Sequence, residues 1–162
     1  MGITINNEKM EIPDDIKEFI TKRIELENGC LPHFYPEINT FQDFQVGYKI
    51  HGNTGERITG IEKGDFRENW FVICSGYSND PFFIDINERQ KNFPVYFAWL
   101  GAGSWSPIQL SDTIKEFTDQ LELLKKIELS GENIQNKLKD NFDLNNEFWM
   151  EVYNAYEEYK HE

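Results

Sequence analysis

Residues 70–85 read W-F-V-I-C-S-G-Y-S-N-D-P-F-F-I-D, and the predicted fold is organised around them. Residues 70–74 and 82–84 are short apolar runs rich in aromatic and β-branched side chains, which is typical of strands buried on both faces. Between these runs, Gly76 permits a positive φ, and Pro81 fixes φ and lacks an N–H, as turn residues do. The stretch therefore predicts two adjacent antiparallel strands joined by a loop longer than a tight hairpin turn.

Further strands are predicted on both sides of this pair. Residues 46–50 alternate apolar and other side chains, and residues 57–62 fit a return strand, so a hairpin is expected here. Residues 94–100 form another apolar run that begins with proline, which is tolerated at the start of a strand. Residues 1–11 are polar and fit a lead-in or a short edge strand. We therefore expect a mostly antiparallel central sheet of about five or six strands.

Helices are predicted from apolar residues at three- and four-residue spacing. The expected ranges are about 13–27, 111–129, 133–139 and 144–159, and Ser111 is expected to cap the second helix. Because strands and helices are segregated along the chain, we expect an α+β fold with an N-terminal helix and C-terminal helices. Residues 1–162 are expected to form a single domain, in which residues 131–162 are a C-terminal helical extension.

The chain is strongly acidic. It holds 29 aspartate and glutamate residues against 16 lysine and arginine residues, which gives a net charge of −13. Binding of nucleic acid normally needs a basic surface that displaces counterions, so this composition argues against a nucleic-acid ligand. A basic protein partner fits better, since opposite charge steers association. The alternative, that the charge only keeps the domain in solution, stays open.

Cofactors, metals and membrane insertion are not expected. Cys30 and Cys74 do not form a C-x-x-C pair, which favours a reduced cytoplasmic protein. No segment approaches the ~18 apolar residues that a membrane span needs, and the N-terminus has no signal-peptide pattern. His33 lacks a second ligand at a suitable spacing. The glycine-rich loop around Ser104 matches neither a phosphate-binding nor a nucleophile motif.

Seven residues are candidates for partner binding, although no strong motif contains them: Trp70, Asp80, Asp85, Trp99, Trp105, Glu151 and Tyr156. The first five would also line an aromatic pocket for a small ligand, with the two aspartates as a conceivable acid–base pair. Structural roles are the alternative for Asp80 and Asp85, because one closes a turn and the other ends a strand. The last two lie on a Tyr- and Glu-rich helix that suits docking to a basic protein. Its tyrosines packing inward is the alternative.

Three motifs, taken in order, resemble the SUKH superfamily, the Smi/Knr-type domain. The first is I-P-D-D-I-K-E-F-I at residues 12–20, followed by Asn28 and Gly29. The second is the central pair of runs with its Gly, Asn-Asp-Pro and F-F-I-D residues, at 70–73, 76 and 79–85. The third joins P-V-Y, W-S-P, L-S and I-K-E-F, at 94–96, 105–107, 110–111 and 114–117. Together the motifs cover roughly residues 12–124.

The resemblance implies a non-enzymatic domain without a cofactor. Many bacterial members of this superfamily neutralise a cognate polymorphic toxin, often a nuclease, by binding it, and a yeast member is a cell-wall regulator. The resemblance therefore implies an immunity protein whose partner is a basic protein toxin. A regulatory or scaffold module and a small ligand-binding domain are the alternatives that stay open, and the sequence does not indicate the oligomeric state.

Overall fold

The computed structural model describes residues 2–5 and 8–159. An antiparallel sheet in the order β3-β4-β5-β6 stands at its centre, with strands Trp70–Ser75, Pro81–Asp85, Val95–Phe97 and Ile108–Ser111. Strands β1 (Gly2–Ile5) and β2 (Glu8–Glu11) form a separate hairpin. The α-helices are α1 (Asp14–Lys22), α2 (Ile114–Ser130), α3 (Ile134–Asn141) and α4 (Glu147–Tyr159), and the 3₁₀ helices are η1 (Ile38–Gln45), η2 (Ile86–Lys91) and η3 (Leu100–Ala102). The predicted α+β class is confirmed, but the central sheet has four strands instead of five or six.

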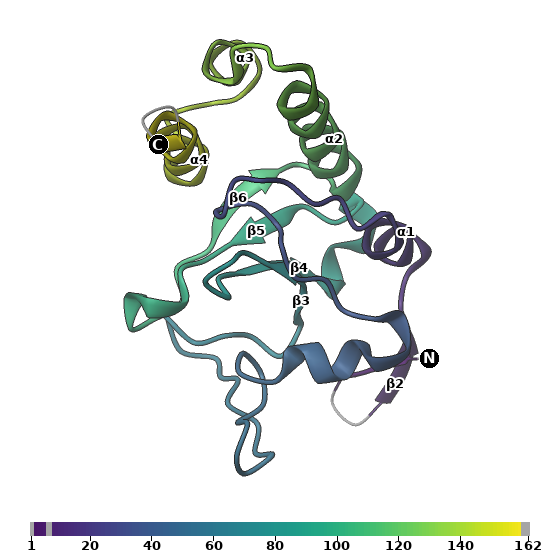
Figure 1. The fold of residues 1–162 in the computed structure, drawn as a ribbon. Helices are drawn as coiled ribbons and strands as arrows, with labels where there is room; N and C mark the ends of the chain where they lie inside the picture. The colour runs from purple at the N-terminus through teal and green to yellow at the C-terminus, as the bar shows by residue number, and fades with distance from the viewer. Residues whose placement is uncertain (1, 6–7, 160–162) are drawn as a thin grey trace.

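The predicted strands at residues 46–50 and 57–62 are not formed, although the chain does reverse between them. These residues belong to a long loop that protrudes from the body of the molecule (Figure 1). Their antiparallel pairing is limited to the bridge between Ile50 and Arg57 and the backbone hydrogen bonds beside it. Tyr48 and Lys49 are both buried although they are neighbours, whereas a strand would place them on opposite faces. The residues with apolar alternation therefore lie in a buried bend of the loop and not in a half-buried strand.

The run at residues 94–100 supplies only the short strand β5, and β6 completes the sheet without having been predicted. Ser111 is the last residue of β6 and not a helix cap. The cap of α2 is Thr113, whose side chain accepts a hydrogen bond from the N–H of Glu116 at 3.0 Å. The predicted cap of this helix is therefore two residues too early.

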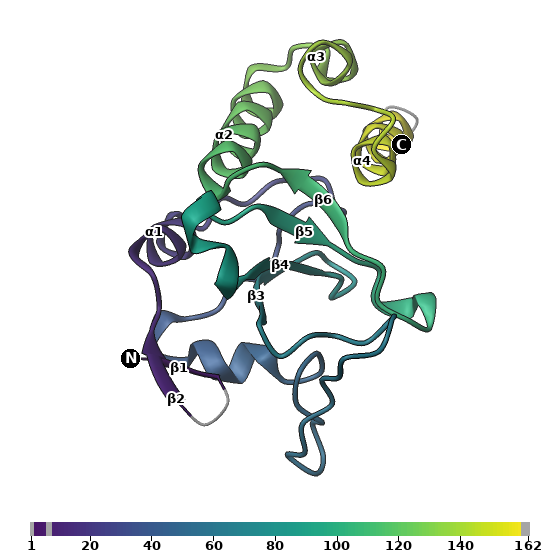
Figure 2. The same cartoon turned by 180° about the vertical axis from the view of Figure 1, so that it is seen from behind.

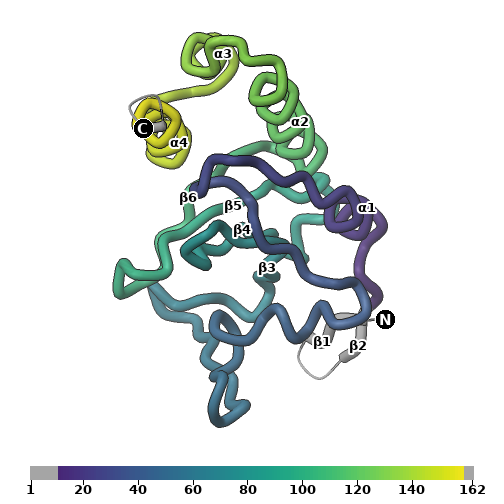
Figure 3. Tube along the Cα trace, in the orientation of Figure 1, coloured from purple at the N-terminus to yellow at the C-terminus, as the bar shows by residue number. Residues whose placement is uncertain are grey.

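Helix α1 ends earlier than predicted, because Arg23 adopts a left-handed conformation with a φ of 46°. The chain then runs toward α4, reverses, and returns across the β3–β4 hairpin, as the tube in Figure 3 shows. Asn28, predicted as part of a helix stop, lies at this reversal. Its side-chain amide donates to the carbonyl oxygen of Val152 in α4 at 3.0 Å.

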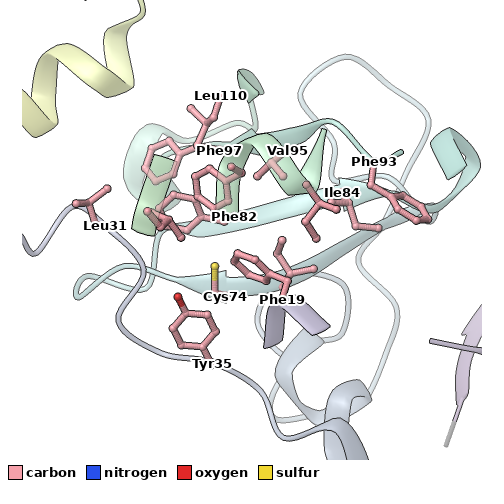
Figure 4. Close-up of a cluster of buried hydrophobic side chains, with 14 of the residues drawn as sticks. Phe19, Leu31, Tyr35, Cys74, Phe82, Ile84, Phe93, Val95, Phe97 and Leu110 are labelled. Atoms are coloured by element: carbon pink, nitrogen blue, oxygen red, sulfur yellow. The ribbon is translucent and has the colours of Figure 1, made fainter. Parts of the chain in front are cut away.

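The main hydrophobic core lies between one face of the sheet and helices α1, α2 and α4. Phe82 of β4 stands near its centre (Figure 4), with ring centroids 5.6 Å from Phe117 of α2 and 5.4 Å from Phe148 of α4. Trp149, Val152 and Tyr156 of α4 are buried in the same core. The predicted C-terminal extension therefore includes a helix that is part of the core of the domain.

The opposite face of the sheet carries a smaller core. Its buried members are Tyr48, Phe66, Val72, Phe83 and Ala98. These residues are covered mainly by loops, with Phe44 of η1 packed against them, and the protruding loop lies below the sheet in both Figure 1 and Figure 2. Because most of this cover is irregular backbone, its buried N–H and C=O groups need hydrogen-bond partners outside a helix or a sheet.

The outer edge of β3 is covered by the end of η1 and by the loop segment at Phe34. The side-chain amide of Gln45 donates to the carbonyl oxygen of Val72 at 3.0 Å and its oxygen accepts from the Val72 N–H at 2.8 Å. Further along, the Ser75 N–H donates to the carbonyl oxygen of Phe34 at 2.9 Å. These bonds satisfy backbone groups that an open edge would offer to another strand.

Candidate partner-binding surface

The three candidate tryptophans do not share a pocket. Trp70 and Trp105 both pack on Phe66 in the smaller core, with centroid distances of 5.1 and 5.3 Å. Trp99 packs on Phe97 at 5.2 Å and belongs to the main core on the other face of the sheet. The predicted aromatic pocket is therefore wrong, because the sheet itself separates its members.

The two aspartates are also apart, at opposite ends of β4. A strand of five residues spans roughly 16 Å, too far for an acid–base pair that acts on one bond. Asp85 Oδ1 accepts from the N–H of Asn87 at 2.9 Å and caps η2. Asp80 Oδ1 accepts from the N–H of Leu100 at 2.8 Å and holds the start of η3 against the β3–β4 turn. Both aspartates thus have the structural roles that their positions indicate.

His33, Phe34 and Tyr77 form an exposed group that we call the surface aromatic cluster. The His33 ring lies 4.7 Å from each of the other two ring centroids. Phe34 is 42% exposed and Tyr77 is 66% exposed, so both present apolar area to solvent. Large exposed aromatic side chains grouped in this way mark interaction sites more often than isolated ones do.

The backbone around the surface aromatic cluster is well fixed. The N–H groups of His33 and Phe34 both lie within hydrogen-bond distance of the Ser75 carbonyl oxygen, at 2.8 and 3.0 Å. The Tyr77 N–H donates to the carbonyl oxygen of Gly29 at 3.1 Å, which ties the β3–β4 turn to the chain reversal. A Cβ atom at Gly76 would lie 3.4 Å from two carbonyl oxygens of that reversal, so the turn approaches it closely.

Three carboxylates act on the chain reversal next to the surface aromatic cluster. Burial raises the pKa of the Cys30 thiol, and the negative charges of Glu151, Asp80 and Glu158 raise that pKa further. The same three carboxylates therefore make this part of the surface negative. Glu151 is exposed on α4, as expected for a partner-binding residue. The raised pKa keeps Cys30 protonated at neutral pH, which makes it a poor nucleophile.

Tyr156 lies on a different side of α4 from Glu151. Five residues along a helix correspond to a rotation of about 140°, so the two side chains face different surroundings. Tyr156 is only 6% exposed, and its hydroxyl donates to Glu128 Oε2 of α2 at 2.6 Å. The alternative in which tyrosines of this helix pack inward is therefore correct for Tyr156.

A buried lysine holds the protruding loop and was not singled out by the sequence. Lys49 is 2% exposed, its Nζ donates to the carbonyl oxygen of Glu68 at 2.6 Å, and the Phe71 ring centroid lies 3.5 Å away. Burial, and to a smaller extent the positive charge of Arg57, lowers the pKa of Lys49 to about 7. Arg57 itself pairs with the Glu68 carboxylate, which also accepts from the Thr59 hydroxyl.

Comparisons with protein-family models, with curated proteins and with solved structures found no match. The resemblance to the SUKH superfamily therefore stays a prediction from the motifs. In the part of the chain that the structure describes, no group of three or more His, Cys, Asp or Glu side chains is placed to hold a metal ion. Within the same residues, no helix combines the length and apolar character that crossing a membrane requires.

Proposed function

We propose that this protein is a non-enzymatic binding protein that neutralises a basic protein toxin by direct contact, as an immunity protein does. The observation that carries the proposal is the surface aromatic cluster, together with the carboxylates of Asp80, Glu151 and Glu158 that act on Cys30 in the adjoining chain reversal. Tyrosine and phenylalanine anchors next to acidic groups suit a partner whose own surface is rich in arginine and lysine.

Each part of this surface has a separate role in the proposed complex. The net charge of −13 attracts a basic partner over a distance and raises the rate of association. Phe34 and Tyr77 then lose their exposed area to the partner, which slows dissociation. Arginine side chains of the partner stack on Tyr77 and pair with the nearby carboxylates. Occupation of the toxin's basic active surface prevents its substrate from binding.

The proposal is tested by co-expressing the protein with the toxin domain encoded by a neighbouring gene and measuring growth. Wild-type protein should restore growth, and Phe34→Ala combined with Tyr77→Ala should restore it poorly. Ile61→Ala is the matched control, because Ile61 is 87% exposed on the protruding loop, outside the surface aromatic cluster. Equal rescue of growth by the double variant and the control would mean that the surface aromatic cluster does not contribute to toxin binding.

A regulatory or scaffold module would behave differently in the same cells. It would give no rescue with any adjacent toxin domain, and affinity purification of the tagged protein would recover several unrelated partners. That outcome would replace the immunity function while keeping the binding role of the surface.

A further inference from the structure

A groove of about 550 Å³ opens where the end of α2 meets α3 and α4. The three helices that border it stand together at one end of the molecule in Figures 1 and 2. Each helix contributes one apolar side chain to the groove: Ile127, Ile134 and Tyr156. Ile127 and Tyr156 are buried and Ile134 is half-buried, so they form its floor.

Carboxylates also line this groove: Glu27, Glu128 and Glu132. The Glu128 carboxylate is held by two donors, the Glu27 N–H at 3.0 and 3.2 Å and the Tyr156 hydroxyl at 2.6 Å. Lys137 Nζ lies 3.7 Å from Glu132 Oε2, and both side chains are about half exposed. A surface pair of this kind is weak and can exchange for another cation.

The end of α2 adds to the negative potential of the groove. Gly131, which also lines the groove, follows the last residue of α2, where the helix dipole is negative. The C-terminal end of a helix normally favours a basic side chain. The last turn of α2 has no basic residue and carries Glu128 instead. The groove thus combines an apolar floor, carboxylates and the negative end of a helix.

We propose that this groove binds an arginine or lysine side chain of the basic protein partner, an inference that rests on the proposed function. The aliphatic stem lies against Ile127, Ile134 and Tyr156, and the cationic head pairs with the carboxylates. The chain reversal connects this groove to the surface aromatic cluster, because Glu27 lines the groove and the Gly29 carbonyl accepts from Tyr77.

The probe is acetyl-arginine amide, titrated into the full-length ¹⁵N-labelled protein and followed by NMR. Saturable shifts are expected at the amides of Gly131 and Glu132, with a dissociation constant on the order of millimolar. Acetyl-citrulline amide has the same shape without the charge and should bind at least about tenfold more weakly. Glu27→Gln combined with Glu132→Gln should weaken arginine binding at least about fivefold, since two exposed carboxylates are lost.

The matched control is Glu56→Gln combined with Glu62→Gln, which removes the same charge from the protruding loop. Equal binding of the arginine and citrulline probes, shifts outside the groove, or equal weakening in the control would each overturn the proposal. A partner that binds the groove variant as tightly as the wild type would overturn it as well. The probe experiment needs no toxin, so failure there leaves the proposed function standing, whereas failed rescue with intact probe binding counts against the proposed function.

Discussion

We expect the free energy of unfolding of the wild-type protein to rise with pH above neutral because of Lys49. Replacing Lys49 with methionine should remove this contribution. In the unfolded chain the Lys49 amine has its ordinary pKa of 10.5, whereas burial lowers that pKa to about 7 in the fold. Between these values the unfolded chain binds more protons than the folded protein, so the free energy of unfolding rises with pH.

The size of this effect follows from the linkage between proton binding and folding. A full proton taken up on unfolding changes the free energy of unfolding by about 1.4 kcal/mol per pH unit. Between pH 7.5 and 9.5 the wild type should therefore gain on the order of 2 kcal/mol relative to Lys49→Met. Methionine suits the comparison because its thioether packs well beside the Phe71 ring.

The assay is urea unfolding followed by tryptophan fluorescence at pH 7.5, 8.5 and 9.5. Lys63→Met is the matched control, because Lys63 is exposed on the same loop and should leave the pH dependence unchanged. Titration of the other groups is shared by all three proteins and cancels in the comparison. Parallel curves for wild type and Lys49→Met would refute the reasoning, because they would mean that the buried amine titrates as it does in water.

Three further substitutions test the packing and the hydrogen bonds of the fold. Phe148→Ala should lower the free energy of unfolding in urea by about 3–5 kcal/mol, since its ring contacts Phe82 and Phe97 in the main core. A loss below about 1 kcal/mol would mean that α4 is not part of that core. Thr113→Ala should lower the thermal midpoint by removing a helix cap worth about 1 kcal/mol, and an unchanged midpoint would contradict the capping role of Thr113. Gln45→Leu should cost about 1–3 kcal/mol and speed hydrogen exchange at the Val72 amide; unchanged exchange would contradict the edge-covering role.

The parts of the fold that were predictable are strands buried along nearly their whole length and helices whose apolar residues follow the helical period. The strands at residues 70–75 and 81–85 and the helices at 114–130 and 147–159 were expected close to their observed places. Strand β6 could not be recognised, because its four residues include Gln109 and Ser111 and carry no apolar run. The prediction of a strand around Lys49 failed because two neighbouring residues, Tyr48 and Lys49, are both buried.

The candidate site was harder to predict than the fold, since it depends on contacts between distant segments. Alternation along the chain places Trp99 on the same face as Phe97, but only the pairing of β3 with β4 and of β4 with β5 shows that Trp70 lies on the opposite face. The surface aromatic cluster joins two loops through the backbone of Ser75. Aromatic residues in loops with proline and glycine, outside any strand or helix period, are the sequence signal that was available for it.

Calorimetric titration with the toxin domain encoded by the neighbouring gene, at low and high salt, is the decisive test of toxin binding. We expect tight binding that weakens as salt rises, because the acidic surface steers association, and a loss of affinity when Phe34 and Tyr77 are both replaced by alanine. Absence of binding to the wild-type protein at either salt concentration, or affinity that is the same at both and unaffected by the two replacements, would contradict it.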